Sequence, residues 1–401
     1  MRKLVQKLRI LLQRILRYVA RTEEPQATLL LLSVFERNYD RRKNDAFDLR
    51  DFIKCLPLRR IHTNHSVKRM KQALGIAGNL FNDLPLLPEN GVTSGRKADL
   101  YLHWGVPRIT KIISHAIQQD IPMLFVEGGL INTIAMPSDG SVPLCYRYNT
   151  SFLIDDIGLY FCSLKPSRLE LMLNSNMFLL ERQFNRARKL IETIISQRLT
   201  KYNYQAIFRP NLGSAGRMKV LVVDQTRQDR SIDLGMAGPA TFEEMLTAAV
   251  RENPEADIFI KTHPEQTTFG SIKAGHYCGL KERNNIRFIR EAINPISLIQ
   301  GVDKVYVVTS QMGMESLLCG KETHVFGVPF YSHWGLTIDR QKYDHRKRTR
   351  SLEELFYITY LHYCRYVNPA TKKECEIEEI LDYLLEQRTR YFTKYKIRCE
   401  L

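Results

Sequence analysis

The chain has 401 residues, more than one compact core usually holds, so we expect two domains. Hydrophobic residues make up 44% and charged residues 25%, which argues against a disordered or fibrous protein, and no apolar run approaches the ~20 residues that cross a bilayer. Lys and Arg number 59 against 43 Asp and Glu, so the net charge is +16. This excess favours an anionic partner: nucleic acid, an anionic membrane surface or a phosphorylated substrate.

Residues 1–24 are predicted to form a basic amphipathic helix. Leu and Ile recur at helical spacing between residues 4 and 16, and seven Lys or Arg residues precede the first acid, Glu23. Such a helix can lie on an anionic leaflet, or it can pack its leucine stripe on the domain behind it. No signal peptide is recognised in this segment.

Residues 25–210 alternate strand-like and helical segments. Apolar runs at 28–35, 98–105 and 122–129 are predicted strands, 151–161 is a predicted hairpin turn, and 166–203 is a long helical region. A second alternating series begins at residue 217, so residues 211–375 form a second domain. The pattern predicts an α/β protein with two Rossmann-like domains, whose parallel sheets face a central cleft. A basic helix over 376–401 can cross back to the first domain.

Ligands of open parallel sheets bind beyond the carboxyl ends of the strands, so polar residues that follow apolar runs are the candidates for a site. Lys261 and His263 follow the run DIFI, and Pro264 keeps His263 extended at the strand tip. The imidazole could donate a hydrogen bond to a phosphate leaving group. The alternative is a surface histidine in a turn.

The segment 308–321 ends a strand and begins a helix. Ser310 and Gln311 lie where free backbone N–H groups could bind an anion, and Gly313 would let a ligand approach the backbone. Glu315 could accept hydrogen bonds from ribose hydroxyls. The alternative is an ordinary helix with a serine N-cap. Neither a Walker lysine spacing nor GxGxxG is present.

Three carboxylates stand near predicted strand ends. Asp224 and Asp229, in DQTRQD, are candidate nucleophiles or bases, or they cap a turn or helix. Glu127 precedes two glycines and could take a proton from an acceptor hydroxyl, or it pairs with an Arg near a glycine turn.

No metal site is predicted. His62 and His65 lack a third ligand at a matching spacing, and the eight cysteines contain no CxxC pair. Scattered thiols of this kind are typical of a reduced intracellular protein.

Three ordered blocks, THPE, TSQMGMESLLCGK and VFGVPFYSHWGLTIDR, closely resemble the bacterial capsule-type β-Kdo transferases of the KpsC and LipB group. Upstream, VEGGLINT, DDIGLYF, KYN and the DQ…D.S pattern are similar to segments of that family, so the resemblance covers residues 95–345. Gly128 stands where many members have an acid or Arg, so no role is assigned that needs two adjacent carboxylates there. Length and basic N-terminus look most like the N-terminal Kdo transferase module of the O-antigen enzyme WbbB.

The resemblance implies a GT-B-like pair of domains, CMP-β-Kdo as donor, and transfer with retention to a saccharide in lipopolysaccharide O-antigen or capsule assembly. No cofactor or metal is implied. We expect a double displacement with Asp229, ahead of Asp224, as nucleophile. Glu127 and His263 complete the catalytic set. The donor-binding residues are Lys261, Ser310, Gln311, Gly313, Glu315 and Lys321.

The implied partners are an oligosaccharide or lipid-linked glycan acceptor, an anionic inner-membrane surface and, in a longer chain, further glycosyltransferase modules. The implied location is the cytoplasmic side of a Gram-negative inner membrane. Three alternatives stay open: a transferase for CMP-sialic acid or a related nonulosonate, a basic nucleic-acid-binding protein, and a noncatalytic membrane scaffold. The sequence shows no known nucleic-acid-binding module, so no nucleic-acid partner is expected.

Overall fold

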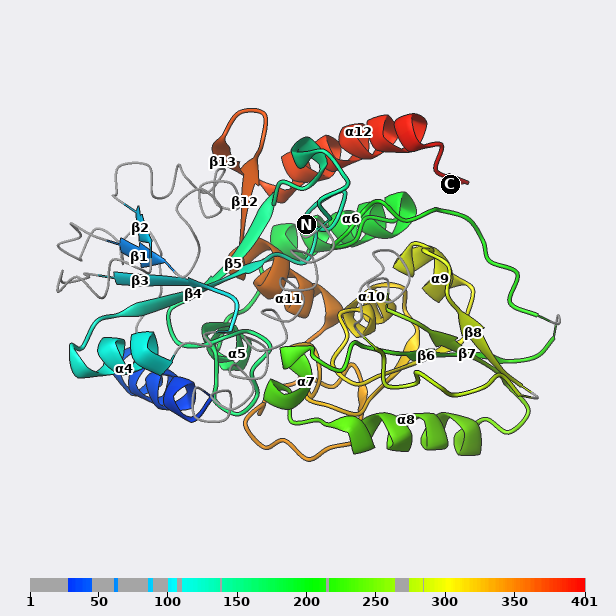
Figure 1. Cartoon of the computed structure of the whole chain (residues 1–401), viewed down its shortest axis with the longest axis horizontal. Helices are drawn as coiled ribbons and strands as arrows, with labels where there is room; N and C mark the ends of the chain where they lie inside the picture. Colours follow the sequence, from blue (N-terminus) through cyan, green and yellow to red (C-terminus); the bar gives the residue numbers. More distant parts are fainter. Residues whose placement is uncertain are drawn as a thin grey trace, which may run out of the picture.

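A computed structural model describes residues 28–44, 61–63, 86–88, 100–106, 110–137, 139–213, 216–263, 274–283 and 285–400. The predicted helix over residues 1–24 and the side chains of His62 and His65 lie outside these described residues. Two β-sheets, each covered by helices, lie next to each other in the molecule (Figure 1).

In the described part of the chain, six strands form the second sheet, in the order β11-β10-β9-β6-β7-β8. Every neighbouring pair is parallel, as predicted. The strands are β6 (Lys219–Val223), β7 (Asp257–Lys261), β8 (Ile286–Ile289), β9 (Lys304–Val307), β10 (Glu322–Val325) and β11 (Ile338–Asp339). The helices are α7 (Arg230–Leu234), α8 (Pro239–Glu252), α9 (Pro295–Gln300) and α10 (Met312–Leu318). Strand–helix alternation in the sequence therefore predicted β6 to β10 and their parallel pairing correctly, whereas the short β11 was not predicted.

The first sheet is mixed, so the prediction of a wholly parallel sheet is wrong here. Its order among the described residues is β13-β12-β5-β4-β3-β1-β2, and β5, β12 and β13 are antiparallel to their neighbours. The strands are β1 (Ile61–Thr63), β2 (Leu86–Pro88), β3 (Leu100–Trp104), β4 (Met123–Gly128), β5 (Ser151–Asp155), β12 (Cys364–Asn368) and β13 (Lys373–Cys375). Only a 3₁₀ turn, η3 (Leu144–Tyr146), separates β4 from β5 in this described stretch, and without a crossover helix the chain returns antiparallel.

The apolar run at 28–35 is helical, not a strand. Residues 28–42 form a helix that buries Leu31, Val34 and Phe35, whereas Leu29 is 68% exposed. The buried positions are spaced i, i+3, i+4, as on one face of a helix. Phe35 meets Phe125 of β4 edge to face, with ring centroids 5.0 Å apart. This helix and α4 (Thr110–Gln118) cover the same face of the first sheet (Figure 1).

Residues 151–161 do not form the predicted hairpin. The Asp155 carboxylate accepts hydrogen bonds from the backbone N–H groups of Ile157 and Gly158, at 2.8 and 2.9 Å, which turns the chain at the end of β5. The chain continues into α5 (Arg168–Asn174) instead of a second strand. The long helical region predicted next is broken at 175–180, and α6 (Glu181–Gln197) follows.

The chain returns to the first sheet earlier than predicted. After α11 (Leu352–Phe356) and the π-helical turn η5 (Tyr357–Tyr363), β12 pairs with β5. Residues 364–375, predicted in the second domain, therefore belong to the first sheet, because backbone pairing with β5 fixes them there. The final helix α12 (Ile377–Tyr395) packs on β12 and α6. One hydrophobic cluster includes Leu153 of β5, Leu221 of β6 and Leu384 of α12, so the two sheets share a core.

Candidate functional site

A cleft of about 710 Å³ lies between the two sheets. Glu127 at the end of β4 lines it from the first sheet, and Asp224, Lys261 and Thr309 line it from the ends of β6, β7 and β9. The carboxyl ends of the strands therefore meet at this cleft, as predicted from the sequence.

Asp224 is held rigidly on the second-sheet side. Its side chain is 2% exposed, and its Oδ1 accepts hydrogen bonds from the backbone N–H groups of Gln225 and His276, both at 2.9 Å. Gln225 in turn donates to Thr309 Oγ1 at 3.0 Å and accepts from the Thr309 backbone N–H at 3.0 Å. This exchange joins the ends of β6 and β9 and shapes the floor of the cleft.

Asp229 is the N-cap of α7. Its Oδ1 accepts from the Ser231 backbone N–H at 2.9 Å, and its Oδ2 accepts from Gln225 Nε2 at 3.3 Å. The capping alternative is thus confirmed for Asp229, and capping fixes the direction of the carboxylate. The same carboxylate is half-buried in the cleft, where its charge acts on Glu127 and Lys201.

Glu127 projects from the opposite sheet. Burial raises the pKa of Glu127 to about 7; Lys201 opposes this rise and Asp229 adds to it. The adjacent Gly128 is required for packing, because a Cβ there would lie 2.7 Å from Asn132 Nδ2. A carboxyl group with a pKa near 7 can exchange protons at neutral pH.

Lys201 is a charged residue of the cleft that the sequence analysis did not single out. Its ammonium carries the opposite charge to Glu127, Asp229 and Glu315 and acts electrostatically on all three. Its side chain makes no hydrogen bond within the described residues. The only sequence signal for Lys201 is that the KYN segment, which begins with it, is one of the segments similar to the capsule-type β-Kdo transferases. No spacing rule predicts that this lysine interacts with three carboxylates distant in the sequence.

The α10 side of the cleft contains Ser310, Gln311 and Glu315, as predicted. Glu315 is 5% exposed, and burial raises its pKa to about 8, with Lys201 acting in the opposite direction. Gln311 Nε2 donates to the Leu130 backbone carbonyl at 2.8 Å, so this side chain bridges the two sheets. Ser310 Oγ accepts from the Met312 backbone N–H at 3.3 Å.

Two predicted binding residues do not line the cleft. Gly313 is buried, and a Cβ there would lie 2.1 Å from Tyr331 Oη, so its small size serves the close approach of Tyr331 and not of a ligand. Lys321 follows the opposite end of α10, where its backbone N–H donates to the Ser316 carbonyl. The N-terminal end of this short helix meets the cleft, whereas Lys321 follows its C-terminal end and Gly313 lies on the face that packs against Tyr331.

Lys261 and His263 both line the cleft. Lys261 is 4% exposed, and burial lowers its pKa to about 8. Its Nζ donates to the Thr262 carbonyl at 2.9 Å. With a pKa of about 8, Lys261 stays mostly protonated at neutral pH, so its ammonium group can contact an anion in the cleft. His263 is half-buried and is the last described residue before residues 264–273.

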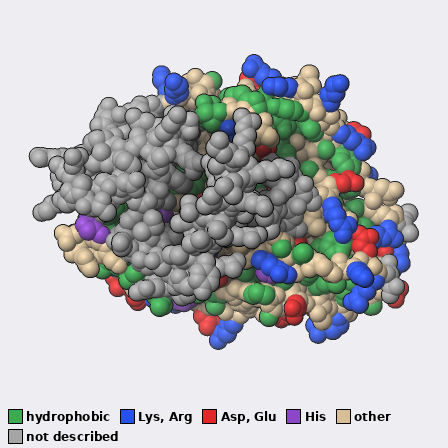
Figure 2. Space-filling view, viewed as in Figure 1, with side chains coloured by type: hydrophobic (Ala, Val, Ile, Leu, Met, Phe, Trp, Pro, Cys, Tyr) green, Lys and Arg blue, Asp and Glu red, His purple; other side chains and the backbone are tan. Residues whose placement is uncertain are grey.

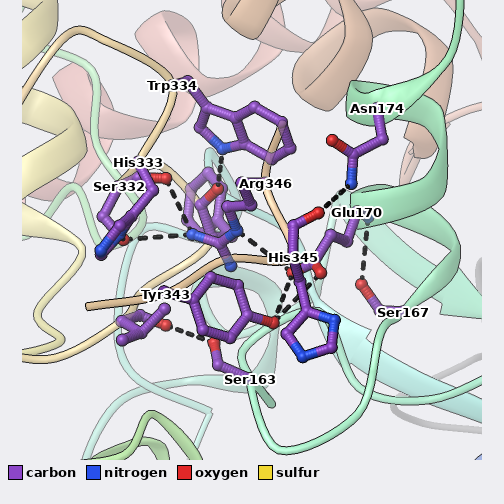
Figure 3. Close-up of polar contacts among 12 residues, drawn as sticks. Ser163, Ser167, Glu170, Asn174, Ser332, His333, Trp334, Tyr343, His345 and Arg346 are labelled. Carbon is purple, nitrogen blue, oxygen red and sulfur yellow. Dashed lines mark hydrogen bonds and ion pairs between the residues drawn. The ribbon is translucent and has the colours of Figure 1, made fainter. Parts of the chain in front are cut away.

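Pro329 and Phe330 complete the wall of the cleft, and a buried ion pair holds their loop. Arg346 Nε lies 3.1 Å from Glu170 Oε2 of α5, and its Nη1 donates to the carbonyls of Pro329 and Ser332 (Figure 3). Tyr343 donates to the same carboxylate (Figure 3). The ion pair connects the first-sheet domain to a loop of the second.

Two α/β domains that face a common cleft define the GT-B-like class, as predicted. The family described as capsule polysaccharide biosynthesis protein matches residues 100–366, and the chain belongs to this family. The capsule polysaccharide modification protein LipA of Neisseria meningitidis serogroup B is 34% identical over 359 residues, which are 86% of this chain and 49% of LipA. The chain thus spans about half the length of that relative. The lipopolysaccharide-processing protein LpsZ of Rhizobium meliloti is 34% identical over 72% of this chain and 64% of LpsZ.

Two solved structures have the same fold. The KpsC β-Kdo 2,4 transferase of Thermosulfurimonas dismutans superposes with a TM-score of 0.71 at 32% identity, covering 81% of this chain and 97% of that chain. The KpsC β-Kdo 2,7 transferase of the same organism superposes with a TM-score of 0.57 at 22% identity, covering 82% of this chain and 99% of that chain. The predicted resemblance to KpsC-type proteins is therefore confirmed, whereas closeness to WbbB stays a prediction. No helix in the described ranges is long and apolar enough to cross a membrane.

Proposed function

We propose that this protein transfers Kdo from CMP-β-Kdo to a saccharide acceptor with retention of configuration. One observation carries the proposal: Glu127 and Asp229, from opposite sheets, meet around Lys201 in a single cleft. Two carboxylates and a cation are what a double displacement on an anionic sugar requires. The similarity to a solved β-Kdo transferase at 32% identity supports the choice of donor.

In the first step, an Asp229 oxygen attacks the anomeric carbon of Kdo while the bond from that carbon to the phosphate oxygen breaks. CMP leaves with the bonding electron pair, and His263 donates a hydrogen bond to its phosphate. The Asp229 carboxylate becomes an ester with the sugar. Lys201 offsets the repulsion between Asp229 and the carboxylate of Kdo, because its positive charge lies near the attacking group.

In the second step, the acceptor hydroxyl attacks the same carbon and gives its proton to Glu127. The ester bond breaks and the Asp229 carboxylate is restored. Two inversions leave the configuration retained. A pKa of about 7 lets Glu127 accept this proton and release it afterwards to water. No cofactor or metal takes part in either step.

We infer that CMP lies against the second sheet, with Ser310, Gln311, Glu315 and Lys261 as its neighbours. The protonated form of Glu315, favoured by its pKa of about 8, can both donate to and accept from ribose hydroxyls. The acceptor then enters from the first sheet, on the side of Glu127. We place the protein at an anionic membrane surface, where a lipid-linked glycan would be met.

The decisive experiment incubates the protein with CMP-Kdo and a panel of oligosaccharide acceptors and determines the product linkage by NMR. A β-Kdo linkage is expected. CMP-sialic acid is the competing donor in the same assay, and turnover of that donor alone would replace the proposal. Mass spectrometry after rapid mixing with donor should find the protein heavier by one Kdo at Asp229. An adduct on Asp224 would move the nucleophile, and no adduct would favour front-side attack.

A further inference from the structure

Five tyrosines gather on one surface outside the cleft. Tyr146 and Tyr148 come from the loop before β5, and Tyr383, Tyr391 and Tyr395 come from α12. Ring centroids of Tyr391 and Tyr395 are 4.5 Å apart, and those of Tyr146 and Tyr391 are 5.1 Å apart. We call these five residues the tyrosine surface. Figure 2 shows green side chains, the colour that includes tyrosine, over the part of the molecule where Figure 1 places α12, with Lys and Arg beside them.

The tyrosine surface has two layers. Tyr146 and Tyr391 are buried, at 9% and 7% exposure, and they support Tyr395, which is 37% exposed. Tyr148 and Tyr383 are half-buried. Tyr383 lies close enough to Tyr148 for that phenol to contribute to its raised pKa, although burial is the larger cause. The outer rings therefore pack on buried ones.

None of the five phenol hydroxyls has a hydrogen-bond partner among the described residues. Other tyrosines of this chain do: Tyr343 donates to Glu170, and Tyr363 donates to Asp155 at 2.8 Å. The hydroxyls of the tyrosine surface are thus left to solvent or to a ligand rich in hydroxyl groups. Flat rings with free hydroxyls match a sugar, whose C–H face packs on an aromatic ring while its hydroxyls form hydrogen bonds.

The surface charge selects an acidic ligand. Lys394 Nζ lies 5.4 Å from the centroid of the Tyr395 ring, and Lys396 follows at the end of α12. Both are exposed, and neither is in an ion pair in the described part of the chain. Among the acids nearby, Glu386 pairs with Arg390 and Asp139 accepts a hydrogen bond from Ser141, whereas the exposed Asp382 is in no ion pair in the described part of the chain. Two cations therefore remain available to an anionic group.

Two backbone segments connect the wall of the cleft to the elements that carry the tyrosine surface. Met136 lines the cleft, and the preceding Ala135 donates its backbone N–H to the Tyr146 carbonyl at 2.8 Å. On the other side, Gln205 lines the cleft, and Ile207 donates to the Arg398 carbonyl, just beyond α12, at 2.9 Å. Ala135 and Ile207 are buried, so these two segments tie the elements that carry the tyrosines to the wall of the cleft.

We propose that the tyrosine surface binds an acidic oligosaccharide, namely the part of the acceptor that lies beyond the reacting hydroxyl. This rests on the proposed function, because that function supplies the acceptor. A lipid surface fits less well: in the described residues, the two most exposed apolar side chains, Phe178 at 78% and Leu29 at 68%, lie in the α5–α6 connection and on the helix over 28–42, not here.

The test uses fluorescently tagged β-Kdo oligosaccharides of one to four residues, with binding followed by anisotropy. In the wild type, affinity should rise with length. Tyr383→Ser and Tyr395→Ser should each weaken binding of the tetrasaccharide about tenfold, near 1.4 kcal/mol, and leave the monosaccharide unaffected. Tyr395→Phe should keep most of the affinity because the ring remains. Tyr39→Ser, on the helix over 28–42, is the matched control.

Transfer kinetics separate this inference from the proposed function. In both serine variants the acceptor KM should rise while kcat and the donor KM stay unchanged. A wild type that binds the longer oligosaccharides more tightly but transfers no Kdo refutes the proposed function alone. If the serine variants match the wild type in both oligosaccharide binding and acceptor KM, the proposal for the tyrosine surface is refuted. It is also refuted if the serine variants bind anionic vesicles less well than the wild type but bind the oligosaccharides equally well.

Discussion

Burial raises the pKa of Glu127, and the Asp229 carboxylate adds to this rise across the cleft, although Glu127 ends β4 of the first sheet and Asp229 caps α7 on the side of the second. This coupling means that the two carboxylates share one electrostatic environment. The Lys201 ammonium opposes this rise in the pKa of Glu127, whereas the Asp229 carboxylate adds to it. In the proposed mechanism, this arrangement places the nucleophile Asp229 and the base Glu127 in one site.

Asp229→Asn should abolish transfer while leaving the fold intact. The amide oxygen of Asn can still cap α7 by accepting from the Ser231 N–H, but it is not a nucleophile. We expect kcat to fall by about three orders of magnitude or more, with CMP affinity unchanged. Calorimetric CMP titration and single-turnover kinetics measure the two quantities.

Asp224 provides the comparison. Asp224→Ala should be destabilising by about 1–3 kcal/mol for each of the two backbone N–H groups that lose their acceptor. Asp224→Asn keeps an acceptor oxygen and should retain both stability and measurable transfer. Loss of transfer in Asp224→Asn together with activity in Asp229→Asn would reverse the assignment of the nucleophile.

The rate should depend on the ionisation of Glu127. As a base, Glu127 must be deprotonated, so kcat/KM should rise with pH and level off above a pKa of about 7. Lys201→Met removes a positive charge that lowers this pKa, so the acidic limb should move to higher pH. Lys165→Met, a surface change that breaks an ion pair with Glu36, is the control. If the acidic limb of the pH profile stays in place in Lys201→Met, the Lys201 charge does not set the pKa that controls the rate.

Strands β6 to β10 of the second sheet were predictable because strand-like apolar runs alternate there with helical segments, whereas the two-residue β11 was not predicted. The helix over 28–42 was not, because a short apolar run such as 28–35 fits a buried strand or a buried helix equally well. The return of β12 to β5 pairs residues more than 200 positions apart, as in Cys364 with Leu153, and no local pattern encodes such a contact. Lys201 was missed for the same reason: its role depends on three carboxylates distant in sequence.

Gly313→Ala should destabilise the fold and not selectively weaken donor binding. The added methyl group would collide with the Tyr331 ring, and overpacking of this kind typically costs about 1–3 kcal/mol. Urea unfolding and CMP titration of the same preparation distinguish the two effects. If stability is retained while CMP affinity falls tenfold, the glycine serves the ligand as the sequence first indicated.

Deleting residues 2–22 should weaken attachment to vesicles that contain anionic lipid. The seven basic residues and the leucine stripe of this segment predict an interfacial helix, although the segment lies outside the described residues. Cosedimentation with anionic and neutral vesicles measures the change, and transfer to a water-soluble acceptor should be unaffected. A shortened protein that aggregates, beside a full chain that ignores vesicles, would instead assign the helix to packing.

The buried pair of Glu170 and Arg346 should stabilise the wall of the cleft. Both side chains are at most 4% exposed, so Arg346→Met leaves an unpaired buried carboxylate and should cost about 3–5 kcal/mol. Glu170→Gln should also be destabilising, and the double variant should cost less than the sum because no charge is left unpaired. The donor KM should rise in Arg346→Met, since Arg346 holds the carbonyls of Pro329 and Ser332.

The exposed ion pair of Arg188 and Glu353 is the control. It is of similar length, but its arginine is 61% exposed, so Arg188→Met should cost at most about 1 kcal/mol. Chemical unfolding of the four variants completes the comparison, and additive costs for the pair would show that the two residues act independently.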